Sequence, residues 1–394
     1  KRNQNTKKNI ENNYDTKKER LYWIDNLRWI WILLIVLWHC YFPWWNIVTK
    51  YLFSFHVVLF FLISWFLFNE KKHTIFSKFF KNKFLRLIIP FFTFNIIYFA
   101  YYKIWWYLSW NPISTRIIDF SVWVFYWDYL WDNWWYINNT WGFNISNTST
   151  WFLTSLFVCS LYYFLVNKSL KNKYIKVIFL FICSVLIYIE SKNTNFRMPW
   201  NLEISLMMIL PYGLANIFKE NIKNYIKKIN IYYIFLLPII ISLNIYFINP
   251  NTNISTNYYW TYYLFLLNSF LWVSTIAIIA KLIWKNKFLN FLWKNSIIIL
   301  WFEWIKSPLV KNSIFNSLWL EFYNNPLAWI LQFILTILLL IPIIMVSQPI
   351  HREILKDKLR GVLHKRLVDE RLHEFNCNMF LYLRKIIFFM FKTA

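Results

Sequence analysis

Charged residues are scarce in this chain. Only 15% of its 394 residues are charged, while 58% are hydrophobic and 23% aromatic. A soluble globular chain carries about 25% charged residues and does not show one apolar run after another. Apolar runs of about 20 residues recur here, which is the length of a membrane-spanning helix and far more than a barrel strand needs. The composition therefore excludes a soluble protein and predicts an all-α membrane protein.

Acidic residues are few even among the charged ones, with 18 Asp and Glu against 43 Lys and Arg, so the net charge is +25. Such a balance can indicate nucleic-acid binding. Here the basic residues cluster in short loops between apolar runs, as the positive-inside rule predicts for a protein in a membrane. We therefore predict no nucleic-acid partner, about ten transmembrane helices, and N- and C-termini that are both cytoplasmic.

Glycine is nearly absent, with 3 glycines against 26 tryptophans. Average usage predicts about 7% glycine, or roughly 28 residues. Several tryptophans stand where a small residue would fit a helix crossing, including Trp38 beside His39 and Trp65 within FLISWFLF. Because some bacterial lineages read UGA as glycine, we hypothesise that many of these tryptophans are glycine codons. The alternative is a true tryptophan belt at the membrane surface.

Cysteine is also rare. The four cysteines, Cys40, Cys159, Cys183 and Cys377, form no CxxC pair, and three of them fall in or beside predicted spans. This spacing argues against a metal site and against a disulfide framework. The predicted site therefore contains no metal.

The domain organisation follows the charge pattern. Residues 1–24 are polar and rich in Lys and Asn, so we predict a disordered cytoplasmic tail. Residues 25–348 contain the ten predicted spans, with a long polar loop at 109–150 on the outside. Residues 70–83 predict a short amphipathic helix at the inner surface. Residues 349–394 differ in composition and predict a cytoplasmic amphipathic tail of uncertain origin.

The first span carries the strongest candidate site. Arg28 begins the run RWIWILLIVLWHC, and His39 lies inside it. Eleven residues at about 100° and 1.5 Å per residue place the two on one helix face, about 16 Å apart. An ionisable residue inside a span is a functional-site candidate, because it must face protein or water. Alternatively, His39 makes a structural hydrogen bond to a neighbouring helix and has no catalytic role.

Further ionisable residues are predicted near the same depth as His39. His56 lies a few residues into the second span, predicted from Leu52 to Asn69, and Glu203 lies near the outer start of the sixth, while Glu303 and Lys306 lie near the outer end of the ninth. Each alone is weak evidence, since Glu203 or Glu303 can simply sit at the interface. Together they favour a polar chamber open to the outside.

The inner side carries a second set of charges. Asp25 and Arg28 are three residues apart on one helix and can pair, and Lys83 and Arg86 have the same spacing. Such cations can bind the phosphates of a nucleotide. The alternative is that any single lysine only helps to orient the protein in the membrane, as the positive-inside rule describes, and binds no ligand.

Several segments in order resemble the membrane acyltransferase-3 family of multi-span O-acyltransferases. They are YWIDNLRWIWILLIVLWHC, FSFHVVLFFLISWFLF and FFKNKFLRLIIPFFTFNIIYF, supported by STWFLTSLF, MPWNLEISLMMILPYGLANIFK and FLWKNSIIIL. The subset that acts on cell-surface sugars, including fucose 4-O-acetylase-like members, looks nearest. Where the family shows glycine, this chain has Trp29, Trp38, Trp65 and Trp293. The family's RxxR motif appears as Lys83 to Arg86, with one arginine replaced by lysine.

The resemblance implies an enzyme, an acyltransferase at the plasma membrane with a multi-pass topology. It implies transfer of an acyl group, most simply acetyl, from cytoplasmic acetyl-CoA to a hydroxyl of a cell-surface or lipid-linked carbohydrate. In this interpretation His39 is the general base and Arg28 serves the donor phosphates or the thioester. Lys83 and Arg86 bind the CoA phosphates. His56 or Glu203 orients the acceptor.

Two other functions remain open from the sequence. A transporter or flippase for a lipid-linked glycan would use the same polar chamber, although no internal repeat of the kind common in transporters is evident. A non-catalytic membrane sensor would use the C-terminal tail as its output. The acceptor, the acyl chain length and the oligomeric state are not predicted.

Overall fold

The computed structural model describes residues 22–40, 50–66, 68, 75–93, 95–96, 151–193, 198–247, 252–254, 258–259, 261–283, 287–296, 298–300 and 330–345. The loop at 109–150, the C-terminal segment 351–394 and the residues Glu303 and Lys306 lie outside this part. So does the predicted tail up to residue 21. A helix already begins at Tyr22, so the last three residues of the predicted tail are helical.

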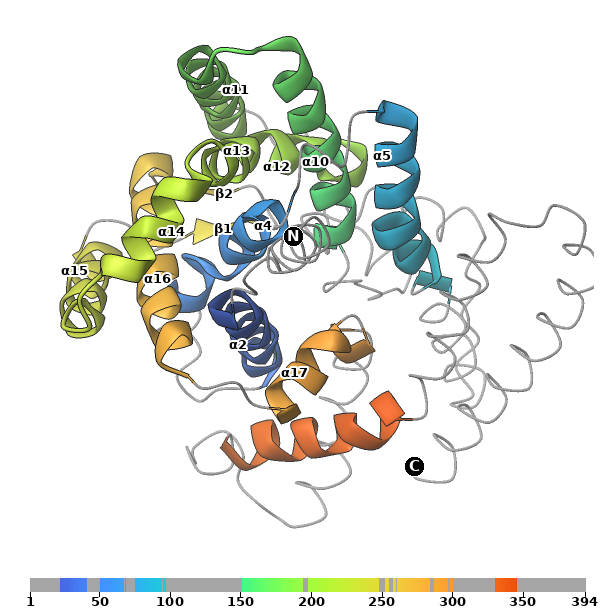
Figure 1. Cartoon of the computed structure of the whole chain (residues 1–394), viewed down its shortest axis with the longest axis vertical. Helices are drawn as coiled ribbons and strands as arrows, with labels where there is room; N and C mark the ends of the chain where they lie inside the picture. The colour runs from blue at the N-terminus through green and yellow to red at the C-terminus, as the bar shows by residue number, and fades with distance from the viewer. Residues whose placement is uncertain are drawn as a thin grey trace, which may run out of the picture.

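The described part is predominantly helical, as the composition predicts (Figure 1). Its one strand pair is two residues long on each side, with Thr252–Asn253 (β1) antiparallel to Tyr258–Tyr259 (β2). The helices that position the site and the pocket are Tyr22–His39 (α2), His56–Phe66 (α4), Phe76–Lys83 (α5), Trp151–Ser169 (α10), Lys173–Asn193 (α11), Leu202–Met207 (α12), Ile209–Ile217 (α13), Lys219–Lys228 (α14), Tyr233–Phe247 (α15), Tyr262–Leu282 (α16) and Lys287–Lys294 (α17). The other elements are a π-helical turn at Phe84–Ile88 (η2), a 3₁₀ turn at Pro199–Asn201 (η3) and the unlabelled helix Ile330–Met345.

The helices α2 and α4 lie at the centre of the bundle (Figure 1). The helix α2 packs against α16, α17 and α4, and α4 packs against α13. Trp23 meets Phe66 and Trp31 stacks on Phe60, at ring-centroid distances of 5.3 and 4.2 Å. Residues early in α2 therefore meet residues late in α4, and the two helices are antiparallel, as consecutive membrane spans must be.

Two helices of the described part, α11 and α16, are long and apolar enough to cross a membrane. A third span results if Leu202–Ile217 and α14, which meet at a bend of 71°, are taken together. Shorter apolar helices lie at Lys50–Phe66, Tyr233–Tyr246 and Ile330–Met345; the first overlaps the predicted second span, and the other two lie inside the predicted seventh and tenth spans. The helical membrane character is thus confirmed, while the count of ten spans and the side of the termini stay predictions.

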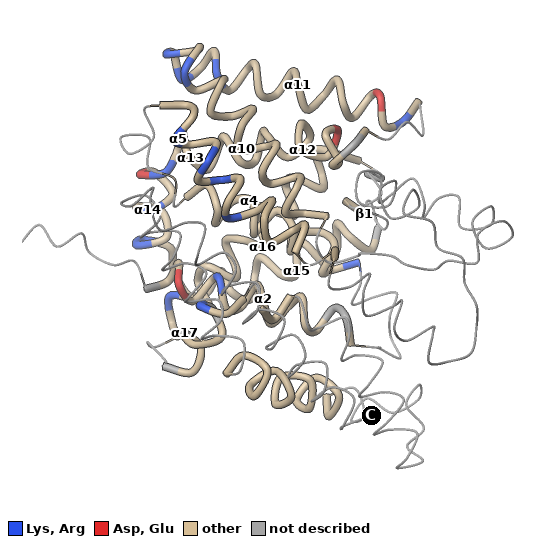
Figure 2. The backbone as a smooth tube through the Cα atoms, turned by 90° about the vertical axis from the view of Figure 1, so that its right-hand side faces the viewer, with Lys and Arg blue, Asp and Glu red and all other residues tan. Residues whose placement is uncertain are grey.

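Most lysines and arginines of the described part lie at one end of the bundle, around α5, α14 and α17 (Figure 2). We call this the basic end. The predicted surface helix is present there as α5, whose Phe79 is buried while the residues around it are exposed. An amphipathic helix with one apolar contact and a cationic face fits the boundary between lipid and water.

Two tryptophans bear on the glycine hypothesis. Trp200 has φ 60° and ψ 24°, in the left-handed region, and precedes a helix start at Leu202. That conformation costs a residue with a Cβ roughly 1–2 kcal/mol, whereas glycine adopts it readily. Trp65 is fully buried among Phe68, Tyr163 and Tyr212. Trp65 therefore does not belong to a tryptophan belt at the membrane surface. Its ring is nevertheless well packed, so its contacts do not by themselves call for glycine.

Gly213 lies where α13 packs tightly against α10 and α11. A Cβ at this position would overlap Leu180 Cδ1 and lie 2.6 Å from Tyr163 Cε2. Tyr163 and Leu180 are themselves fully buried, on α10 and α11. Small residues allow this kind of close packing between membrane helices.

We predict glycine at position 200 in protein made by its native host, because the backbone there is left-handed. Mass spectrometry of the tryptic peptide that follows Arg197 measures this directly, since glycine makes the peptide lighter by an indole side chain. The peptide that covers Trp65 gives a second, independent position. Tryptophan at full occupancy at both positions would contradict the recoding hypothesis.

We predict that Gly213→Ala lowers the free energy of unfolding by about 1–3 kcal/mol, through overpacking against Tyr163 and Leu180. Thermal unfolding in detergent measures the loss. Adding Leu180→Ala to the same protein removes one of the two overlapping partners and should recover part of it. An unchanged melting temperature for Gly213→Ala alone would show that α10 and α11 can move away from α13 without cost.

Candidate functional site

The first candidate residues share one unbroken helix. The helix α2 runs from Tyr22 to His39 and includes Arg28, so the predicted helical spacing between the two holds along its backbone. Their positions lie on one face, about 16 Å apart. The side chain of His39 is outside the described part of the structure, so its surroundings stay a prediction.

Arg28 is held near the start of α2. Its Nη1 donates to Asp25 Oδ1 at 3.1 Å, and both side chains are largely buried, with 16% and 20% exposed. This confirms the predicted pairing of Asp25 with Arg28. The carboxylate fixes one edge of the guanidinium, whose fork of five donors can also serve an anionic ligand.

Asn26 ties the start of α2 to the end of α16. Its side-chain amide donates to the carbonyl oxygens of Ala280 and Ile283, each at 2.8 Å, and its amide oxygen accepts from Trp29 Nε1 at 3.1 Å. The last carbonyls of a helix lack partners within it. Asn26 therefore caps α16 and fixes the height of Arg28 in the bundle.

His56 is buried and has a defined tautomer. Its Nδ1 lies 2.6 Å from the Leu52 carbonyl oxygen. Because a carbonyl only accepts, Nδ1 carries the hydrogen in the neutral ring and the lone pair is on Nε2. The His56 carbonyl accepts from Trp31 Nε1 at 2.9 Å. This bond places the start of α4 beside Trp31, while the expectation that His39 and His56 share one depth stays a prediction, because the side chain of His39 is outside the described part.

Glu203 is fully buried in the first turn of α12. Its Oε2 accepts from the backbone N–H of Met198 at 3.2 Å, across the left-handed turn at Trp200 and Asn201. Ser205 Oγ bonds the carbonyl of Asn201 at 2.8 Å and that of Ser155 on α10 at 3.0 Å. The turn and its carboxylate are therefore fastened to α10.

The two inner cations differ in their surroundings. Lys83 is the last residue of α5; its ammonium lies 5.7 Å from the Phe79 ring centroid and is half-buried. The pKa of Lys83 is lowered to about 8, chiefly because burial disfavours the charged ammonium. The nearby charge of Arg86 also lowers this pKa, whereas Cys159 raises it. Arg86 lies in the π-helical turn η2 and is exposed. Lys83 thus lies against the protein and Arg86 toward solvent.

The structure gathers part of the predicted site. Arg28 and His56 lie on the adjacent helices α2 and α4, which the Trp31 bond joins. Glu203 lies on α12 beside α10, and Lys83 and Arg86 mark the junction of α5 with η2, which packs on α10. Within the described residues no group of three His, Cys, Asp or Glu side chains could hold a metal ion.

Three positioning residues escaped the sequence analysis. Trp31 joins α2 to the start of α4, Asn26 caps α16, and Ser205 joins α12 to α10. An asparagine among apolar residues, one place after Asp25, is a signal for Asn26 because a buried amide needs partners. No sequence pattern distinguishes Trp31 from the other tryptophans.

Comparison with known proteins supports the resemblance. The family described as the acyltransferase domain matches residues 21–345, which is most of the chain. No curated protein matches the chain, and no solved structure does. The match begins one residue before α2 and ends with the helix Ile330–Met345. The chain therefore belongs to the acyltransferase-3 family of membrane acyltransferases.

Proposed function

We propose that this enzyme moves an acetyl group from cytoplasmic acetyl-CoA to a hydroxyl of a cell-surface or lipid-linked carbohydrate at the plasma membrane. The observation that carries the proposal is α2, one helix of an acyltransferase that has Arg28 near its start and His39 eleven residues further on. Donor and acceptor would then reach the reaction from opposite sides of the membrane.

In the proposed reaction His39 removes the proton of the sugar hydroxyl as the oxygen attacks the thioester carbonyl. The carbon–sulfur bond then breaks, and the CoA thiolate takes the proton back from the imidazolium. Arg28, about 16 Å from His39 along α2, would hold donor phosphate, with Asp25 keeping its fork in place. The transfer needs no metal.

Direct transfer is favoured over an acyl-enzyme. Cys40 directly follows His39, and its thiol donates to the Val36 carbonyl of its own helix at 3.2 Å. The thiol is buried and bonded to the backbone of α2, which supports a route without an acyl-cysteine. The hydroxyl of the acceptor is therefore the proposed nucleophile.

The remaining candidates bind the two substrates. Arg86 is exposed at the basic end, and Lys83 lies one turn away, so the pair would hold the CoA phosphates. The lone pair on His56 Nε2 supports a role as a hydrogen-bond acceptor for a sugar hydroxyl. Glu203 would bind the acceptor from α12.

We predict that His39→Ala lowers kcat for acetyl transfer by about 10²–10⁴-fold, the usual contribution of a general base. His56→Ala is the matched control, because it should raise KM for the acceptor more than it lowers kcat. Transfer of labelled acetyl from acetyl-CoA to glycan in membrane vesicles measures both. A well-inserted His39→Ala protein with full activity would refute the general base, and no label in any glycan would favour transport.

We predict that CoA binding weakens as the pH rises through about 8 and above, where Lys83 loses its proton. The sign follows from the lowered pKa, since the ammonium attracts phosphate below this range and the neutral amine does not. Lys83→Gln should bind weakly and lose this pH dependence, while Lys81→Gln, exposed on the same helix, should keep it. Calorimetric titration with CoA measures the effect. An identical profile in wild type and Lys83→Gln would exclude Lys83 from the donor site.

A further inference from the structure

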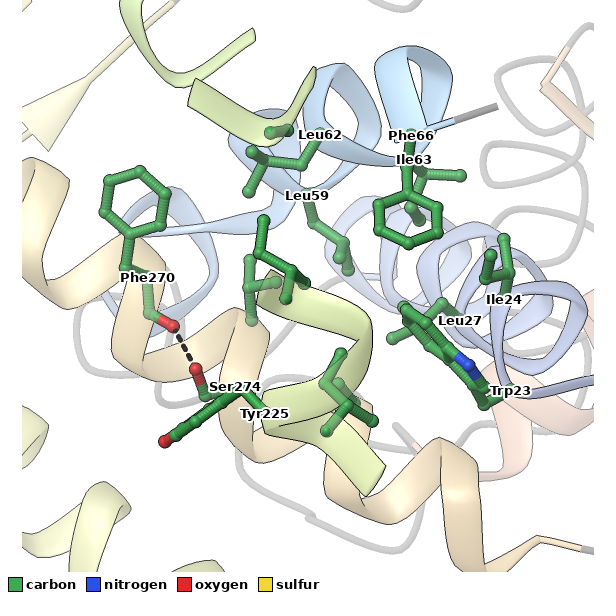
Figure 3. A pocket seen from close by; sticks show the side chains of 15 residues that line it. Trp23, Ile24, Leu27, Leu59, Leu62, Ile63, Phe66, Tyr225, Phe270 and Ser274 are labelled. Atoms are coloured by element: carbon green, nitrogen blue, oxygen red, sulfur yellow. Dashed lines mark hydrogen bonds between the residues drawn. The ribbon is translucent and has the colours of Figure 1, made fainter. Parts of the chain in front are cut away.

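An apolar pocket lies between five helices at the basic end of the bundle (Figure 3). Its volume is about 120 Å³, and its walls come from α2, α4, α13, α14 and α16. An apolar cavity of about 150 Å³ holds one benzene molecule, so this one fits a few methylene groups. None of the predicted donor or acceptor residues lines it.

The residues that line the pocket are almost all apolar, which suits a hydrocarbon ligand. Among its fifteen residues the polar atoms are those of Trp23, Tyr225 and Ser274. Ser274 Oγ already donates to the Phe270 carbonyl of its own helix at 2.9 Å (Figure 3). A peptide or a sugar would leave its polar groups without partners in such a pocket, at a large cost in free energy.

One wall of the pocket is the amphipathic helix α14. It bends by 71° from the helix before it, as expected for a helix that lies in the membrane surface after a span. Ile222 and Ile226 turn into the pocket, while Tyr225, on the same wall, is 51% exposed. The pocket therefore reaches the surface of the protein along α14.

The rim of the pocket is cationic. Lys219 lies 5.3 Å from the ring centroid of Phe66, a lining residue. Lys281 Nζ donates to the carbonyls of Ile226 and Lys227, at 3.2 and 2.9 Å. An ammonium has three donors, so in the described structure one donor of Lys281 is left for an anion beside the pocket.

We propose that this pocket binds a few methylene groups of one acyl chain of an anionic phospholipid, whose phosphate lies at the rim beside Lys281 while Lys219 adds positive charge at the other end of α14. The apolar lining selects the chain, and the lysines select a negatively charged headgroup over a zwitterionic one. Basic pockets between transmembrane helices are suited to anionic headgroups. The site is separate from Arg28, Lys83 and Arg86, so it does not depend on the proposed acetyl transfer.

The test is lipid binding to the full-length protein in detergent, followed by native mass spectrometry with phosphatidylglycerol and phosphatidylcholine of the same chains. Phosphatidylglycerol should bind more tightly. Ser274→Leu, which fills the pocket, should weaken both lipids by about tenfold. Its matched control is Ser242→Leu on α15, whose hydroxyl also bonds its own helix, to Pro238, and which does not line the pocket.

The headgroup is tested by Lys219→Gln combined with Lys281→Gln, since glutamine keeps an amide donor for the carbonyls. This double variant should weaken phosphatidylglycerol by about thirtyfold and leave phosphatidylcholine unchanged. Lys171→Gln with Lys173→Gln removes the same charge from exposed positions and should change neither lipid. Equal binding of the two lipids to wild type, or no effect of Ser274→Leu, would overturn the proposal. Displacement of the lipid by palmitoyl-CoA would overturn it in favour of a pocket for a long-chain donor.

Discussion

The arrangement depends on how polar groups find partners where there is no water. A helix that ends inside or near a membrane has carbonyl oxygens without partners, and each is costly in hydrocarbon. Asn26 meets two of these carbonyls at the end of α16 and so joins the first described helix to a distant part of the chain. Once that contact is made, the height and rotation of α2 are set, and with them the position of Arg28.

The need for hydrogen-bond partners also determines the contact between α2 and α4. Trp31 donates to the carbonyl of His56, which is the first residue of α4, and the ring of Trp31 stacks on Phe60 one turn later. His56 in turn uses Nδ1 on Leu52. The imidazole is thus oriented by the Leu52 carbonyl, and the backbone of His56 is held by Trp31.

The sequence was sufficient for what depends on composition and on helical spacing. Recurring apolar runs predict the helices, and the spacing of Asp25 and Arg28 predicts their ion pair. It was not sufficient for what depends on packing between helices. The hydrogen bond that joins Trp31 to the start of α4 is one example, and no count along the chain reveals it. The different surroundings of Lys83 and Arg86 follow from a π-helical turn, which has no simple sequence signature.

That wide turn at Phe84–Ile88 has one more consequence. A π turn holds one residue more than the regular helix, so everything on its N-terminal side is rotated by about 100° about the axis. The burial of Lys83 is therefore a property of chain length as well as of residue type. A substitution can remove the amine, whereas the loss of one residue from the turn would rotate α5 as a whole and carry Lys83 and Phe79 together away from Phe164 of α10. Evolution could move this cation between the two environments by a single insertion or deletion, with every side chain of the site retained.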